Sequence, residues 1–165
     1  MKNRWFISDL HLGHQGIIEY ERTQFKTLDE MHSEIIDRWN YVIHPHDRVY
    51  ILGDVVWKKS FLPLLGKMKG KKVLIKGNHD NIAKLKDYAE YFEDIRGAMS
   101  LSLDDDLRII ATHIPVHPEQ LERFNFNIHG HLHSKSLKDK RYINVSCEVL
   151  DFIPIHINQI LEGRQ

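Results

Sequence analysis

The chain of 165 residues lacks the features that mark several classes of protein. Its single cysteine, Cys147, cannot form an internal disulfide, which favours a reducing compartment. No apolar run approaches the roughly 20 residues needed to span a bilayer. The N-terminal segment turns polar too early to resemble a signal peptide. These absences predict a cytoplasmic protein that does not associate with a membrane.

An excess of charge of either sign is also missing. Lys plus Arg and Asp plus Glu number 23 each, so net charge gives no support to dedicated nucleic-acid binding. The composition, 42% hydrophobic and 28% charged, is typical of a globular protein. The length suits a single domain over residues 1–165, which can fold without a disulfide or a partner. The oligomeric state stays open.

Histidine is unusually frequent in this sequence. The chain has 12, and most of them cluster. In residues 127–133 (NIHGHLH), His129, His131 and His133 stand at alternate positions. Alternate side chains of an extended segment point to one face. Such a patch is either solvated or gathered around an electron-poor group.

The remaining pattern predicts alternating strands and helices. A capping box at residues 27–30 begins an amphipathic helix over residues 28–43. Shorter helices are expected at 60–68, with Ser60 as N-cap, and at 82–92. Strands are expected at 4–8, 49–52, 73–76, 98–103, 107–112, 126–129 and 142–146, with 155–161 as either strand or helix, and residues 104–106 as a hairpin turn. A βαβ-like first half and a hairpin-rich second half predict an α/β fold with mixed sheets.

Five of these strands end in polar side chains suited to metal binding. The groups are Asp9 with His11; Asp54; Asn78 with His79 and Asp80; His113; and His131 with His133. In open α/β sheets, the functional crevice lies at the carboxyl ends of the strands. We therefore expect the five groups to converge on one place.

The types of side chain indicate the chemistry. Carboxylate, amide and imidazole ligands without thiolate suit Mn²⁺, Fe²⁺ or Zn²⁺. Seven ligands are too many for one ion but fit two ions that share a carboxylate. Two ions roughly 3.5–4 Å apart assist in-line displacement at phosphorus. Gly77 permits a sharp turn before Asn78, after which His79 can face a substrate and protonate a leaving alkoxide, with Asp80 able to orient its ring.

These residues, in this order, resemble the five-block signature of the calcineurin-like metallophosphoesterases. The matching segments are Asp9-Leu-His11, Gly53-Asp54, Gly77-Asn78-His79-Asp80, His113 and Gly130-His131-Leu-His133. The spellings SDLHLGH and HIPVH are similar to those of small, uncapped bacterial and phage members. The resemblance implies a four-layer α-β-β-α sandwich of two mixed β-sheets flanked by helices.

The resemblance also implies roles for the individual residues. The first metal would be held by Asp9, His11, Asp54 and His133, and the second by Asp54, Asn78, His113 and His131. His79 would act as the general acid and Asp80 as its orienting partner. The cofactors would be two divalent metal ions, with Mn²⁺ preferred and iron, zinc, nickel or magnesium as the alternatives.

The function implied is a phosphoesterase in which a metal-bridging hydroxide attacks phosphorus in line. Phosphodiesters are favoured over phosphomonoesters because an uncapped site is open to extended substrates, nucleotides among them. Two alternatives stay open: a nuclease acting on DNA or RNA ends, and a metal-binding scaffold without turnover. For His14, His117 and Trp57, a role at the site competes with simple exposure. His129 is expected to be structural, and His32 and His156 to be surface or helix-end residues.

Overall fold

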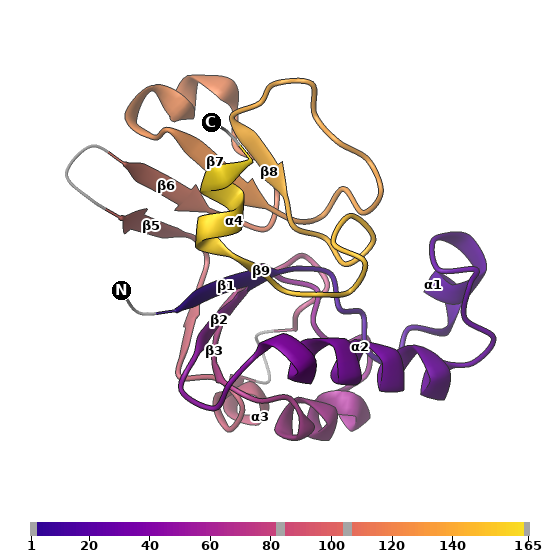
Figure 1. Cartoon of the computed structure of the whole chain (residues 1–165). Helices are drawn as coiled ribbons and strands as arrows, with labels where there is room; N and C mark the ends of the chain where they lie inside the picture. The colour runs from indigo at the N-terminus through magenta and orange to yellow at the C-terminus, as the bar shows by residue number, and fades with distance from the viewer. Residues whose placement is uncertain (1–2, 82–84, 104–106, 164–165) are drawn as a thin grey trace.

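The structure is a computed structural model that describes residues 3–81, 85–103 and 107–163, and it contains two mixed β-sheets (Figure 1). The first sheet has the strand order β4-β3-β2-β1-β9, in which only β9 is antiparallel to its neighbour. Its strands are β1 (Arg4–Ile7), β2 (Arg48–Ile51), β3 (Lys71–Ile75), β4 (Asp94–Arg96) and β9 (Ile155–His156).

The second sheet has the strand order β5-β6-β7-β8. Its strands are β5 (Met99–Ser102), β6 (Arg108–Ala111), β7 (Phe126–His129) and β8 (Tyr142–Asn144). The pair β5 and β6 is antiparallel, whereas β6, β7 and β8 run parallel. Within the described residues the second half thus holds less hairpin than we predicted, because connections containing residues 112–125 and 130–141 return the chain to the same direction.

One apolar core lies between the two sheets. A single buried cluster contains Phe6, Leu52 and Ile75 on the side of the first sheet and Ile109 and Ile128 of the second sheet. The short helix α4 (Ile157–Glu162) adds two more buried isoleucines to this cluster. The first sheet is buried on both faces, which explains why its strands read as continuous apolar runs.

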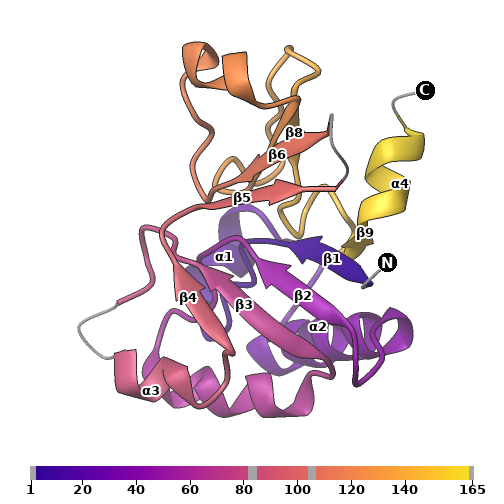
Figure 2. The ribbon, with the colours of Figure 1, turned by 90° about the vertical axis from the view of Figure 1, so that its left-hand side faces the viewer.

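A second core lies on the other face of the first sheet. There the helix α2 (Leu28–Val42) packs Met31, Ile35 and Trp39 against the sheet, and η1 (Lys59–Lys67) and α3 (Leu85–Ala89) lie on the same side (Figure 2). The predicted fold class is confirmed, since two mixed sheets are flanked by helices. On the side of the second sheet the helix η3 (Pro118–Arg123) is short.

Several local predictions need correction. Thr27 caps α2 as expected, but the Glu30 carboxylate accepts the N–H of Lys26, so only half of the capping box is present. The segment predicted as a helix from Ser60 is a 3-10 helix with Lys58 at its N-cap; Pro63 inside it lacks the N–H of a regular helix. Residues 82–84 and the predicted turn 104–106 lie outside the described residues.

The sequence reasoning also missed three elements: α1 (Gln15–Tyr20), β4 and η3. All three are too short for hydrophobic periodicity to reveal. Within the described ranges, no helix is both long and apolar enough to cross a lipid bilayer.

Candidate metal centre

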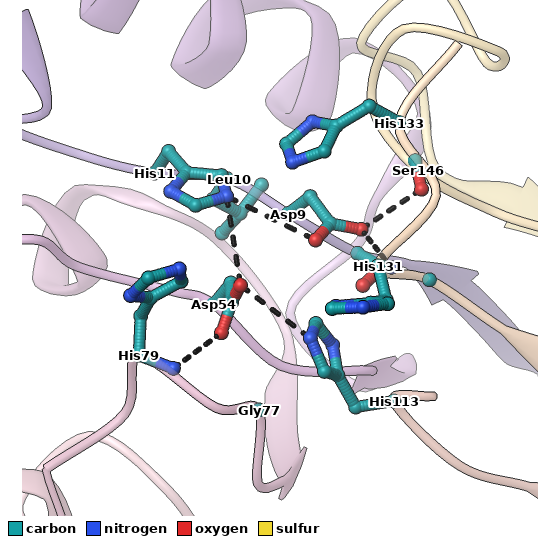
Figure 3. Close-up of polar contacts among 12 residues, drawn as sticks. Asp9, Leu10, His11, Asp54, Gly77, His79, His113, His131, His133 and Ser146 are labelled. Atoms are coloured by element: carbon teal, nitrogen blue, oxygen red, sulfur yellow. Dashed lines mark hydrogen bonds and ion pairs between the residues drawn. The ribbon is translucent and has the colours of Figure 1, made fainter. Parts of the chain in front are cut away.

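The polar strand ends do converge at one edge of the two sheets. A backbone bridge between Ser8, after β1, and Ser146, after β8, joins the sheets there. Around this junction lie Asp9, Asp54 and Gly77 from the first sheet and the histidines that follow β6 and β7 (Figure 3). Side chains up to 124 residues apart in sequence thus share one site.

Asp54 lies at the centre of the cluster. Its Oδ2 is 3.7 Å from Nε2 of His11 and 3.4 Å from Nε2 of His113, as the dashed lines in Figure 3 mark. Its Oδ1 accepts the backbone N–H of His79 at 2.9 Å. A carboxylate between two imidazole nitrogens is placed as a bridging ligand would be.

Asn78 and His131 complete one side of the site. The Asn78 Oδ1 is 2.8 Å from Nε2 of His113 and 3.0 Å from Nδ1 of His131. Because Nδ1 of His113 donates to the Leu52 carbonyl at 2.7 Å, the neutral ring carries its lone pair on Nε2. Acceptor atoms therefore converge at this point, which is the arrangement that a cation stabilises.

Asp9, His11 and His133 form the other side. Their ligand atoms lie within 4.8 Å of one another, and a second such group comprises Asp9, Asp54 and His113. The Asp9 Oδ2 accepts hydrogen bonds from Ser146 Oγ at 2.8 Å and from the His131 N–H at 2.9 Å. Among the described residues, Asp9 Oδ1 and His11 Nε2 are buried without a hydrogen-bond partner. Buried polar atoms without partners are costly, and divalent cations would satisfy both atoms.

The electrostatics of His11 and Asp54 suit metal binding, whereas burial raises the pKa of Asp9, a shift that a bound cation would oppose. Burial, reinforced by the charge of Arg22, lowers the pKa of His11 to about 3, so the ring is neutral and able to ligate at physiological pH. Burial would raise the pKa of Asp54, but the hydrogen bond and charge of His113 in its protonated form outweigh it and bring the pKa to about 2; a cation at this place would take over from that proton. An ionised carboxylate and a neutral imidazole are the forms that bind cations.

The backbone around the ligands is strained. Five of the seven predicted ligands have positive φ: Asp9 (59°), His11 (48°), Asp54 (54°), His131 (69°) and His133 (49°). Residues other than glycine rarely adopt this region, and when they do they gather at functional sites. Two glycines let the segments approach: a Cβ on Gly130 would lie 1.9 Å from Ser8 Oγ, and one on Gly77 would lie 2.2 Å from Asp54 Oδ1.

Asp80 has partners other than the one predicted. Its Oδ1 accepts the N–H of Val55, and its Oδ2 accepts those of Asp54 and Gly77, at 2.8–2.9 Å. The carboxylate therefore holds together the two backbone turns that carry Asp54 and Asn78. This differs from the predicted role of orienting the His79 ring, because both oxygens are engaged by main-chain amides.

Aromatic rings surround His79. Its ring centroid is 4.8 Å from that of Trp57 and 5.8 Å from that of His11. Trp57 is 42% exposed and stacks on His14 at 3.8 Å, so both line the site rather than the core. By contrast, His117 is 69% exposed and caps η3.

The other histidines divide between confirmed and wrong predictions. His129 is buried and donates to the Gly130 carbonyl, a structural role as expected. His156 caps α4, as expected of a helix-end residue. His32 was expected at the surface or at a helix end, but it lies within α2 and is only 5% exposed, with its Nε2 accepting the Gly13 N–H at 2.9 Å.

Three residues near the ligands were not found from the sequence: Arg22, Ser146 and Glu148. Their signal is weak, since a lone arginine, serine or glutamate carries no spacing pattern. A cavity of about 380 Å³ also opens beside the ligands, lined by Lys76, Asn78, Gly97, Thr112, His113 and Ile114.

The chain is similar to several known proteins. The family model of calcineurin-like phosphoesterases matches residues 3–151. The uncharacterized protein MJ1445 of Methanocaldococcus jannaschii is 30% identical over 98% of this chain and 91% of its own length. The Gene 66 protein of Mycobacterium phage D29 is 26% identical over 99% of this chain and its full length.

A solved structure is similar as well. The Aquifex aeolicus protein AQ665, of unknown function, superposes with a TM-score of 0.78 at 25% identity, covering 99% of this chain and all of that one. Together with the family match over most of the sequence, these findings show that the chain belongs to the calcineurin-like phosphoesterase family.

Proposed function

We propose that the protein is a phosphoesterase that depends on two divalent metal ions and hydrolyses phosphodiester bonds, with phosphomonoesters as poorer substrates. The observation that carries this proposal is the position of Asp54 between His11 and His113, next to the unpartnered buried atoms of Asp9 and His11. When bound, the ions, with Mn²⁺ as the first choice, would polarise the phosphoryl oxygens and activate water at neutral pH.

The donors separate into two sets. Asp9, His11 and His133 would hold one ion, and Asn78, His113 and His131 the other. Asp54, whose Oδ2 faces His11 and His113, would be common to both. All donors are nitrogen or oxygen atoms, which suits manganese or iron better than a structural zinc site.

His79 is the group best placed to move a proton. Its backbone is anchored to Asp54 Oδ1, which fixes its distance from the metal centre, while its side chain is exposed. It would donate a proton to the leaving oxygen as the bond to phosphorus breaks. A positioned general acid of this kind contributes a factor of about 10²–10⁴ to the rate.

Two neighbouring features favour a diester over a monoester. The Trp57–His14 pair lies beside His11 and His79, and the 380 Å³ cavity lies beside Asn78 and His113. A phosphodiester carries two organic groups and could place one against each feature, whereas a monoester would fill only one. The stacked rings would suit a planar group such as a nucleobase.

The test compares two chromogenic substrates, bis-p-nitrophenyl phosphate and p-nitrophenyl phosphate, with added Mn²⁺. We expect hydrolysis of both, faster for the diester, and nearly complete loss in Asp54→Ala. His117→Ala is the matched control, since it removes an exposed histidine and should retain full activity. A folded protein that binds Mn²⁺ but hydrolyses neither substrate would instead be the metal-binding scaffold. Cleavage of an oligonucleotide with little action on either chromogenic substrate would identify a nuclease.

A further inference from the structure

Arg22 is a buried charge beside the metal centre that the proposed chemistry does not use. It is 0% exposed, although arginine is among the residues least often buried without a partner. Its Nη1 donates to the Leu10 carbonyl at 2.8 Å, and its Nη2 donates to the Asp9 carbonyl. Its Nε donates to Glu148 Oε1 at 2.8 Å.

Glu148 links this arginine to a histidine of the cluster. Its side chain is 6% exposed, and Oε1 lies 3.1 Å from Nδ1 of His133. A carboxylate can only accept, so Nδ1 of His133 carries the proton and Nε2 the lone pair. Oriented histidine ligands depend on such partners, which fix the tautomer and the ring direction.

The contacts of Arg22 and Glu148 reach Asp9 and His133 of one donor group and the peptide that precedes His11. The guanidinium donates hydrogen bonds to the carbonyls of Asp9 and Leu10. These carbonyls belong to the segment in which Asp9 and His11 have positive φ. Through Glu148 the guanidinium also reaches His133. Asp9, His11 and His133 are the three members of the first group. Among the described residues, no hydrogen bond or ion pair joins Arg22 or Glu148 to Asn78, His113 or His131, the donors of the other side.

We propose that Arg22 and Glu148 are positioning residues that organise the Asp9–His11–His133 side of the site for its ion, with a smaller effect on the other side, which they reach only through Asp9. The inference rests on the proposed metal dependence. Stability alone does not require this ion pair, since apolar residues of similar volume often replace a buried pair without loss of stability. The consequence is an asymmetry: loss of the pair weakens the binding of one ion more than that of the other.

The main test variant is Arg22→Met with Glu148→Leu, which removes both charges together and leaves no lone buried charge. Glu148→Gln is the second variant, since its side-chain oxygen can keep the contacts with Arg22 and His133 while the negative charge is lost. Asp47→Asn is the control: Asp47 is also buried and bonded to main chain and side chain, but it precedes β2, at the opposite end of the strand from Asp54.

Mn²⁺ binding is measured by calorimetric titration of each purified protein, and folding by thermal denaturation. We expect two binding events in the wild-type protein and in Asp47→Asn. In the double variant one event should weaken by a factor of about 10–100, the usual effect of losing such a partner, while the other weakens by clearly less. Glu148→Gln should weaken the same event by less.

Equal weakening of both events, or unchanged binding in the double variant while it remains folded, would overturn the inference. If the double variant does not fold, Glu148→Gln decides by the same criterion. Wild-type protein that binds two ions but hydrolyses no phosphate ester would refute the proposed function and leave the positioning role standing. Wild-type protein that binds no Mn²⁺ would refute both.

Discussion

Replacing Asp80 with asparagine tests whether this carboxylate supports the backbone or orients His79. The structure shows three buried main-chain N–H groups donating to its two oxygens. In Asp80→Asn, one oxygen becomes an NH₂ group, which cannot accept a hydrogen bond. If the remaining oxygen keeps the N–H groups of Asp54 and Gly77, the N–H of Val55 faces a donor.

The cost follows from these contacts. One buried N–H left unsatisfied costs about 1–3 kcal/mol, and two hydrogen bonds lose the charge that strengthened them, at about 1 kcal/mol each. Burial disfavours the charged carboxylate and raises the pKa of Asp80, so removal of the charge offsets part of this cost. We expect a net loss of about 2–4 kcal/mol in the free energy of unfolding.

Urea denaturation followed by circular dichroism measures this loss, with Asp37→Asn as a control at an exposed position of α2. The control should change stability by no more than about 0.5 kcal/mol. The reasoning fails if Asp80→Asn is as stable as the control. Unchanged stability together with an altered pH dependence of turnover would restore the ring-orienting role that we predicted from the sequence.

Further predictions concern the proton donor, the close approach of the two sheets and a buried lysine. His79→Ala should lose a factor of about 10²–10⁴ in turnover while binding two equivalents of Mn²⁺, as metal analysis would show; loss of metal would contradict its role as proton donor. Gly130→Ala should lower the melting temperature and Mn²⁺ affinity, because its Cβ would lie 1.9 Å from Ser8 Oγ and 2.5 Å from Asp9 Oδ2; wild-type values for both would count against this close packing. Burial lowers the pKa of Lys72 from its ordinary value of 10.5 to about 8. Between these two pH values the unfolded chain binds more protons than the folded protein, so the contribution of Lys72 makes the free energy of unfolding rise with pH. Relative to Lys72→Met, the wild-type protein should therefore gain stability over this range in urea denaturation, and a constant difference would refute the shift.

The sequence allowed the strands and the chemistry at their ends to be predicted. Buried parallel strands are recognisable as apolar runs, and the residues that follow them must meet at one edge of the sheet. This reasoning brought together Asp9, Asp54, Asn78, His113 and His131, which the structure places in one cluster. It succeeded because position along a parallel strand fixes the end at which a side chain lies.

The tertiary structure decided which groups hold these ligands in place. Asp80 and Glu148 act through contacts 25–26 and 126 residues away in sequence, at atoms no pattern specifies. The burial of His32 is compensated by the main-chain N–H of Gly13, 19 residues away in sequence. The positive φ of five ligands depends on the packing of two sheets at one edge, because this conformation is a minority state even for aspartate and histidine, which adopt it more readily than most other residues. The sequence alone therefore determined which chemistry gathers and at which strand ends, whereas the meeting of distant segments determined how each ligand is oriented, because orientation depends on contacts that form only when the chain is folded.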